Sequence, residues 1–263
     1  MKMFPFNKEL CLPNSYLNEY TETISYFAGE LEKFCINKYI IEKIRDFPFY
    51  LFGDAEGNIF FNAVANNFFE MCIITAHKLS NDKSKDAYPI KKFQNEIRKE
   101  IKEEYSKRFS LHLKEIGFKK KLDVVAEKTK NLRDKALVHI DALYVKNKLS
   151  LQGISWNDFD TIENNLIIAL NGLSFNSEWM LLPISYDPRV QHPEDTDSRP
   201  DIVKILECIA KESNFLNLPE DNFNVWKIEI KKISKEDLEI FNCYRKKNNL
   251  KKCQEDGFLV DFI

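Results

Sequence analysis

Residues Asn131–Asp141 read Asn-Leu-Arg-Asp-Lys-Ala-Leu-Val-His-Ile-Asp and lie in the middle of a long amphipathic segment, Phe118–Val145. No proline or glycine interrupts this segment after Gly117. Its apolar side chains, joined by one threonine, recur at the spacing of a single helical face: Leu122, Val125, Thr129, Leu132, Ala136, Ile140 and Leu143. The pattern predicts a long helix that packs this face into a core.

Two chemically active side chains border the predicted face. At roughly 100° per residue, Arg133 lies about 60° to one side of the apolar stripe and His139 about 60° to the other. Leu137 and Val138 point away from the stripe, so the helix is expected to bury a second surface. A helix buried on two sides, with an arginine and a histidine between them, indicates an interface that contains a site.

This arrangement resembles the signature of HEPN domains, an arginine followed a few residues later by a histidine. Here five residues separate Arg133 from His139, and polar Asp134 directly follows the arginine. The wider phrase Leu132–Asp141 resembles the abortive-infection (Abi U-type) branch of that superfamily. Two upstream phrases also fit the branch: Phe68-Phe69-Glu70-Met71 leading to Lys78-Leu79-Ser80-Asn81-Asp82, and the helix start Tyr88-Pro89-Ile90.

The resemblance implies a dimer with a composite ribonuclease site that needs neither a metal nor a cofactor. Arg133 and His139 would be catalytic, and Asp134 would orient or tune them. Three further side chains are expected to bind RNA or to neighbour the site: Lys130, Lys135 and Asp141. The implied reaction is transesterification of an RNA phosphodiester to a 2′,3′-cyclic phosphate.

The chemistry of the two residues suits this reaction. Histidine exchanges protons near neutral pH, and arginine offers a permanent bidentate contact to phosphate. On a straight helix, Arg133 and His139 diverge by about 120° and are separated by about 9 Å of rise. One chain therefore makes a poor site, whereas a symmetric dimer lines one cleft with residues from both chains.

Non-catalytic interpretations of the same residues stand beside this one. Arg133 can form surface ion pairs with Asp134 or Glu127, and His139 can be a hydrogen-bonded interface residue. The alternative functions are a catalytically inactive HEPN protein that binds RNA or a nucleotide, and a dimerisation scaffold. The chain has no P-loop, dinucleotide-binding glycine motif, serine-hydrolase elbow or His-Glu-x-x-His motif.

The composition favours a helix-rich protein, with 7 glycines and 9 prolines in 263 residues and 30% charged side chains. We expect a mainly α fold: an antiparallel HEPN-like helical bundle with a small C-terminal α+β extension. The expected boundaries are 1–182 for the bundle, 183–200 for a proline-rich loop or linker, and 201–263 for the extension packed on the bundle.

Periodicity and capping residues locate the elements. The bundle helices are expected at about Asn14 or Ser15 to Arg45, Ile59–Leu79, Pro89–Tyr105 or beyond, and Phe118–Val145, followed by a helix that is capped by Ser155 or Asn157 and runs to about Trp179. The tail is expected to contain helices Asp201–Ser213 and Ser234–Lys247 and strands Val225–Ile233 and Phe258–Ile263. In the first helix, Lys38 interrupts an otherwise apolar seam formed by Tyr20, Phe27, Phe34 and Ile41.

Charge is distributed unevenly along the chain. Residues 83–135 contain 17 Lys/Arg and 9 Asp/Glu, a balance of +8 that leaves −10 for the rest, within a total of −2. Such a basic segment favours phosphate binding, and three nearby aromatic side chains are candidates to stack on bases: Phe93, Tyr105 and Phe109. The alternative is a solvated helix face, because glutamates alternate with the lysines.

The remaining features concern location and partners. The 6 cysteines are scattered without a Cys-x-x-Cys pair, which favours buried thiols in a reducing cytoplasm. We expect no signal peptide, no membrane span and no metal site; the spacing of His192, Glu194, Asp195 and Asp197 selects no metal geometry. The expected partners are RNA, a second copy of the chain and, in a toxin–antitoxin system, an antitoxin protein.

Overall fold

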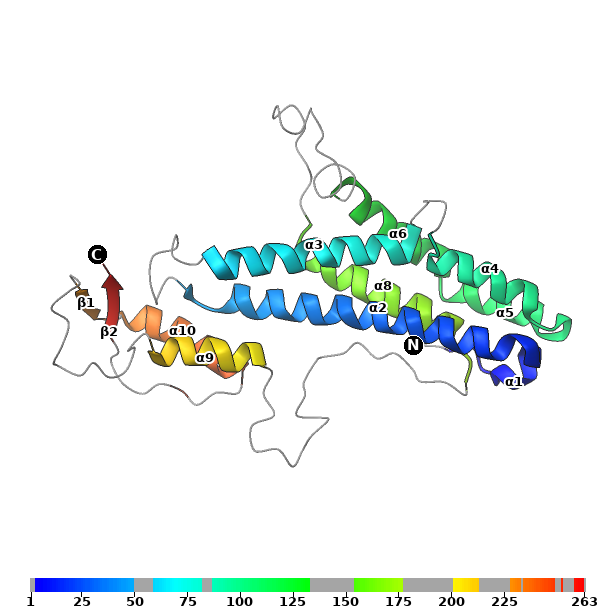
Figure 1. Cartoon of the computed structure of the whole chain (residues 1–263), viewed down its shortest axis with the longest axis horizontal. Coiled ribbons are helices and arrows are strands. Elements are labelled where there is room, and N and C mark those ends of the chain that lie inside the picture. The colour runs from blue at the N-terminus through cyan, green and yellow to red at the C-terminus, as the bar shows by residue number, and fades with distance from the viewer. Residues whose placement is uncertain are drawn as a thin grey trace. The chain divides into compact units, whose positions relative to one another are not determined.

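A computed structural model of the protein shows a mainly α chain, as predicted (Figure 1). The residues that it describes are 3–49, 59–81, 87–132, 154–176, 201–212, 228–232, 234–248, 252 and 258–262. Within these residues the helices are α1 (Lys8–Cys11), α2 (Asn14–Asp46), α3 (Ile59–Asn81), α4 (Ile90–Glu100), α5 (Glu103–Glu115), α6 (Phe118–Leu132), α8 (Trp156–Leu173), α9 (Asp201–Glu212) and α10 (Lys235–Lys247). The two strands are β1 (Ile228–Lys232) and β2 (Phe258–Phe262).

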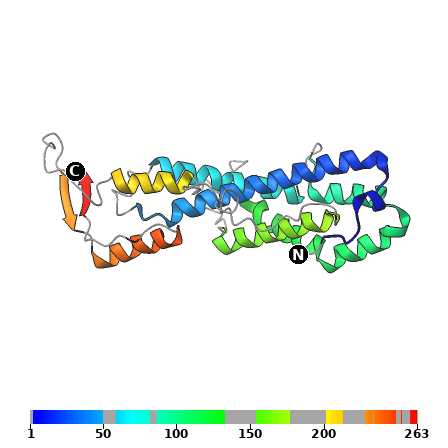
Figure 2. The ribbon, with the colours of Figure 1, turned by 90° about the horizontal axis from the view of Figure 1, so that it is seen from below.

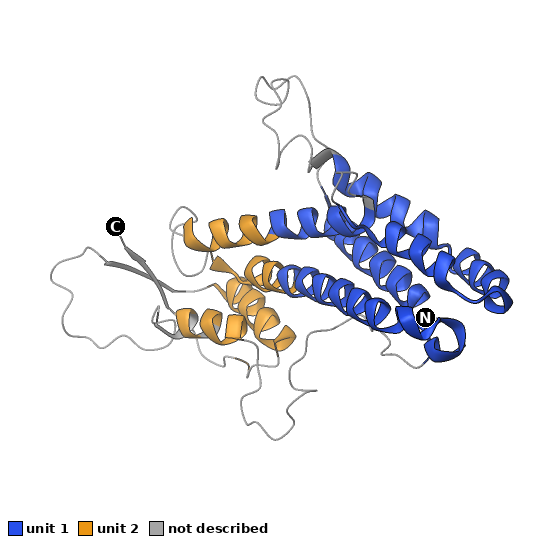
Figure 3. Ribbon diagram, turned by 45° about the vertical axis from the view of Figure 1, so that its right-hand side comes forward, with its two compact units in different colours: residues 1–38, 69–185 blue, residues 39–68, 186–263 orange. Residues whose placement is uncertain are grey.

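The chain divides into two compact units, coloured separately in Figure 3. Unit 1 comprises Met1–Lys38 and Phe69–Ser185, and unit 2 comprises Tyr39–Phe68 and Tyr186–Ile263. Helices α2 and α3 therefore each contribute residues to both units. The division into a bundle at 1–182 and an extension at 201–263 stays a prediction.

The core of unit 1 is rich in aromatic side chains. The Phe4 ring lies edge-on to Phe109 and Phe175, with centroids 5.3 and 5.6 Å apart. Tyr20 stacks on Phe93 at 5.6 Å, and its hydroxyl donates to the carbonyl of Leu173 over 3.0 Å. The polar end of the buried tyrosine is therefore satisfied, and the contact joins α2 to the last residue of α8.

Helix α2 confirms the predicted amphipathic pattern. The seam of Tyr20, Phe27, Phe34 and Ile41 is buried, whereas the neighbouring seam of Leu17, Ile24 and Leu31 is buried only at its last residue. Figure 2 shows α2 running along α8, and ion pairs of Lys38 connect these two helices. Lys38 interrupts the apolar seam because its ammonium group meets carboxylates of α8.

The predicted third helix is broken into α4 and α5, which corrects the expectation of one continuous helix. Ile101 adopts an extended conformation, with φ −65° and ψ 132°, and is buried. The next residue, Lys102, donates its backbone N–H to the carbonyl of Cys11 over 2.9 Å and its ammonium group to the carbonyl of Leu10 over 2.7 Å. Contacts with distant α1, and not a local proline or glycine, accompany the break.

Helix α8 begins at a cap formed by Ser155, one of the two predicted caps. The Ser155 hydroxyl accepts from the N–H of Asp158, whose carboxylate in turn accepts from the N–H of Ser155 over 2.9 Å, so the two residues form a capping box. The helix ends at Leu173, earlier than the predicted Trp179, which lies outside the described residues. Helix α6 packs along α8.

Unit 2 has its own hydrophobic cluster. Phe47, Leu206, Phe241 and Tyr244 are buried together, drawn from the end of α2, from α9 and from α10. Ser234 caps α10 by accepting from the N–H of Asp237 over 3.0 Å, as predicted. Strands β1 and β2 pair antiparallel with Ile230 opposite Val260.

Helix α3 is rich in apolar side chains. By length and composition, it is the one helix among the described residues that could cross a membrane, over Ile59–Ser80. About 22% of this apolar stretch is buried. The sequence expectation had not identified this segment as long enough. Asn62, Asn66 and Glu70 interrupt its surface, and Cys72 and Ile73 are fully buried, a pattern that bundle helices share.

Candidate functional site

Helix α6 carries the first half of the predicted motif segment. It begins at Phe118, as predicted, and is described to Leu132. The side chains of Leu122, Val125 and Thr129 are buried, so the stripe is confirmed along this half. The Thr129 hydroxyl donates to the carbonyl of Val125 over 2.9 Å, which satisfies the one polar member of the stripe inside the helix.

Of the predicted site residues, Lys130 alone falls in the described part of the chain. It is exposed and stands in the last turn of α6, one position after buried Thr129. The other predicted residues lie outside the described residues: Arg133, Asp134, Lys135, His139 and Asp141. In sequence, Arg133 directly follows the last residue of α6, so the described helix leads into the motif.

A salt bridge fixes this end of α6 to α8. The ammonium group of Lys128 donates to the carboxylate of Asp158 in the capping box. The hydrogen bond from Lys128, together with those from Ser155, lowers the pKa of Asp158 from 3.8 to about 2. Because Lys128 stands two residues before Lys130, the helix end that precedes the motif is tied to the capped start of α8.

A second charged cluster lies between α2 and α8. The Lys38 ammonium group is 2.5 Å from the Asp160 carboxylate and 2.6 Å from that of Glu163. The Cys35 thiol lies 3.4 Å from the other oxygen of Glu163. Burial, reinforced by Glu163, raises the pKa of Cys35 above its usual range, which favours the neutral thiol over the nucleophilic thiolate.

The sequence pattern gave only an indirect sign of this cluster. Lys38 stood out as a charged interruption of an apolar seam, and such interruptions indicate a buried partner. Its partners are more than a hundred residues away in the sequence, so they could not be assigned without the fold. Cys35 and Glu163 gave no separate signal.

Two histidines and two aromatic side chains outside the motif belong to the core of the described residues: His77, His112, Phe93 and Phe109. His77 is buried, and the buried His112 ring lies 5.6 Å from that of Phe4. Phe93 and Phe109 are fully buried, so the expectation that they stack on RNA bases is wrong. Tyr105 is partly exposed, with its ring edge-on to Phe6 at 5.2 Å.

Metal-ligating groups do not cluster in the described part of the chain. Among those residues, no group of three or more His, Cys, Asp or Glu side chains is arranged to hold a metal ion. The tetrad His192, Glu194, Asp195 and Asp197 lies outside that part.

The helical architecture and the amphipathic α6 that leads into an arginine–histidine motif are those of a HEPN-like helical bundle. Residues 41–176, more than half of the chain, match the family model HEPN_AbiU2, described as AbiU2. The chain therefore belongs to the AbiU2 family of HEPN-like abortive-infection domains, as the motif predicted. No curated protein and no solved structure matches the chain.

Proposed function

We propose that this protein is a metal-independent endoribonuclease that acts as a homodimer, and that it is the toxic effector of an abortive-infection or toxin–antitoxin system. One observation carries the proposal. Arg133 and His139 have HEPN spacing, lie within the segment that matches the AbiU2 family, and come after α6 in the sequence, a helix whose predicted apolar stripe is buried at Leu122, Val125 and Thr129. The abortive-infection character of the family supports a toxic activity.

The proposed reaction is a transesterification. The 2′-oxygen of the RNA attacks the adjacent phosphorus, the bond from phosphorus to the 5′-oxygen breaks, and a 2′,3′-cyclic phosphate and a 5′-hydroxyl form. His139 accepts the proton of the 2′-hydroxyl and then, as the imidazolium, donates a proton to the leaving 5′-oxygen. The guanidinium of Arg133 binds the phosphoryl oxygens and stabilises their developing charge.

The dimer follows from the placement of the two residues on the helix. Side chains that diverge by about 120° on one helix do not meet on one phosphate, whereas two facing helices bring both kinds of residue to a shared cleft. Asp134, Lys135 and Asp141 are proposed neighbours of that cleft, and Lys130, exposed at the end of α6, is proposed to contact the RNA.

Cleavage of transfer RNA in EDTA by the wild-type protein and by His139→Ala tests the function. We expect cleavage with cyclic-phosphate ends by the wild type and none by the variant, with equal helicity by circular dichroism. Cleavage that persists in His139→Ala would reject the mechanism. No cleavage by either protein would favour the inactive RNA-binding or dimerisation scaffold.

A further inference from the structure

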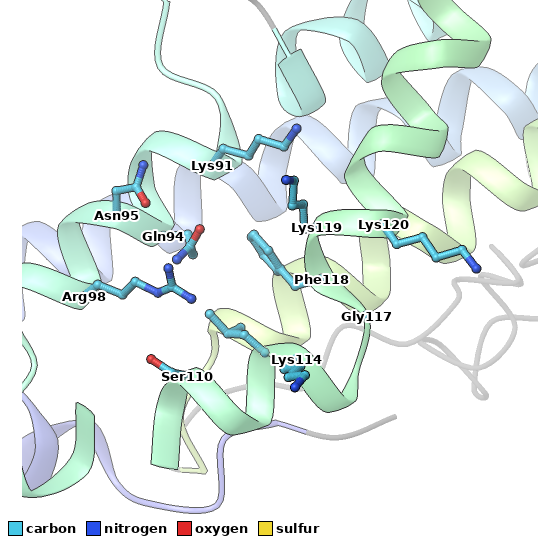
Figure 4. A pocket seen from close by; sticks show the side chains of 11 residues that line it. Lys91, Gln94, Asn95, Arg98, Ser110, Lys114, Gly117, Phe118, Lys119 and Lys120 are labelled. Atoms are coloured by element: carbon cyan, nitrogen blue, oxygen red, sulfur yellow. The ribbon is translucent and has the colours of Figure 1, made fainter. Parts of the chain in front are cut away.

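A pocket of about 480 Å³ lies where α4, α5 and the first turn of α6 meet (Figure 4). Five of its lining side chains are cationic, and none of the described side chains that line it is acidic. The cations come from all three helices: Lys91, Arg98, Lys114, Lys119 and Lys120. The basic character of residues 83–135 is thus partly concentrated on one concave surface.

The pocket cations differ in their surroundings. Lys91 pairs with Asp123 of α6 at 2.6 Å. The side chains of Lys114, Lys119 and Lys120 are exposed, and like charges that line one concavity repel one another. A bound anion relieves this repulsion, so the charge pattern selects a negatively charged ligand.

The rest of the lining suits an anion that also accepts hydrogen bonds. Gln94, which is only 7% exposed, lines the pocket beside Arg98, and Figure 4 shows both side chains directed from α4 toward Phe118 of α6. An arginine fork and an amide offer several donors, which matches the several oxygens of a phosphate group better than a single carboxylate. Buried Phe118 forms an apolar wall.

The start of α6 adds to the positive potential. Gly117, with φ 68°, turns the chain sharply between α5 and α6, and Gly117–Lys120 line the pocket. The first N–H groups of a helix have no acceptor within the helix, and its N-terminus carries a partial positive charge. The five side-chain cations and this helix N-terminus therefore both make the electrostatic potential in the pocket more positive.

We propose that this pocket binds a backbone phosphate of the RNA substrate and holds the strand at a distance from the motif. The inference rests on the proposed function, because it assigns RNA as the source of the phosphate. Helix α6 connects the two sites: the helix spans 15 residues, so Leu132 lies about 21 Å along the axis from Phe118, and Arg133 follows in sequence. An RNA strand several nucleotides long reaches from the motif to the pocket.

The test is the affinity for a labelled single-stranded oligouridylate, measured by fluorescence anisotropy in EDTA with His139→Ala as the background. The pocket variant is Arg98→Ala/Lys119→Ala. The matched control, Lys99→Ala/Lys107→Ala, removes two exposed charges from α4 and α5 that do not line the pocket. We expect the pocket variant to bind about tenfold more weakly and to reduce the magnitude of the salt slope of log K by roughly 0.7, which corresponds to the loss of one phosphate contact.

Each outcome is decisive for the pocket. Equal weakening by the pocket variant and the control, or no measurable RNA binding by the background protein, would overturn the proposal. Displacement of the RNA by inorganic phosphate at the same concentration as the RNA would also overturn the proposal, because the pocket would then be a binding site for free phosphate. The Lys119→Arg variant, which keeps the charge, is expected to bind like the background.

The phosphate-site proposal and the nuclease proposal can be rejected independently of each other. If His139→Ala still cleaves RNA, the proposed mechanism falls, whereas a selective loss of binding in the pocket variant still supports the phosphate site. If the mechanism stands, Arg98→Ala/Lys119→Ala with His139 intact should raise KM for RNA and leave kcat nearly unchanged.

Discussion

Lys38 of α2 and Glu163 of α8 form an ion pair of 2.6 Å in which each side chain is 11% exposed. A buried pair of this kind is weak evidence of net stabilisation, because desolvation offsets much of the attraction. Breaking it by removing one partner is costly, since an uncompensated charge remains buried. The pair therefore fixes which residues of α2 and α8 lie opposite each other within unit 1.

We predict that Lys38→Met lowers the free energy of unfolding by about 3 kcal/mol, because it leaves the Glu163 carboxylate buried without its cation. Urea denaturation followed by circular dichroism measures the change. The double variant Lys38→Met/Glu163→Leu should recover much of the loss, since neither charge remains. A loss below about 1 kcal/mol in the single variant would mean that water or another group compensates Glu163.

The same cluster shows what periodicity can and cannot predict. Apolar spacing located α2, the start of α6 and the buried face of α8, because each depends on neighbours three and four residues away. The partners of Lys38 and the break at Ile101 depend on contacts with distant segments, so local patterns contain no trace of them. Phe93 and Phe109 were misassigned to base stacking because composition does not distinguish a basic surface from the core beneath it.

The sequence gives more information about the identity of the candidate site than the fold does. The Arg133–His139 spacing and its neighbouring phrases resemble the Abi U-type HEPN branch, and the match to the AbiU2 family model confirms that resemblance. The charge balance of residues 83–135 indicated phosphate binding, but only the meeting of α4, α5 and α6 selects the five cations that share a pocket. Which cations share the pocket depends on how the helices pack, and a count of charges along the sequence gives no information about packing.

Asp158 should make stability depend on pH in the acid range. Its folded-state pKa is lowered from 3.8 to about 2, so its contribution is present above about pH 4 and is lost as the pH falls toward 2. Asp158→Ala should therefore destabilise the protein by about 1 kcal/mol at neutral pH, through loss of the capping box and of the Lys128 contact.

Thermal unfolding of Asp158→Ala across this pH range checks the prediction. The difference from the wild type should shrink steadily below pH 4. Asn157→Ala serves as the control, because Asn157 directly precedes Asp158 and its side chain is exposed. This substitution should have little effect on stability at any pH. A difference that stays constant down to about pH 2 would show that the carboxylate charge is not the cause.

Arg133→Lys tests the role proposed for the guanidinium. Lysine keeps the charge but loses the planar pair of donors, so a bidentate phosphate contact cannot form. We expect kcat for RNA cleavage to fall by roughly a hundredfold while RNA affinity changes by less than about threefold, because the lost interaction belongs to the transition state. Steady-state kinetics and anisotropy measure the two quantities, and a fall confined to affinity would assign Arg133 to binding alone.

The proposed composite site makes a distinctive prediction for mixed dimers. Arg133→Ala and His139→Ala should each be inactive as homodimers, because each lacks one kind of side chain in the shared cleft. When the two variants are unfolded together and refolded, the heterodimer retains one intact Arg133 and one intact His139 on opposite chains. Cleavage should reappear, at a rate below that of the wild type, in proportion to the heterodimer fraction determined by native mass spectrometry.

The mixing experiment needs two controls. Each variant refolded alone must stay inactive, which excludes contamination by a cellular nuclease. A mixture with Arg133→Ala/His139→Ala in place of His139→Ala should not recover activity, since no chain then supplies the missing arginine. Heterodimers that form in full yield and remain inactive would contradict a cleft in which one Arg133 and one His139 from opposite chains are sufficient for cleavage.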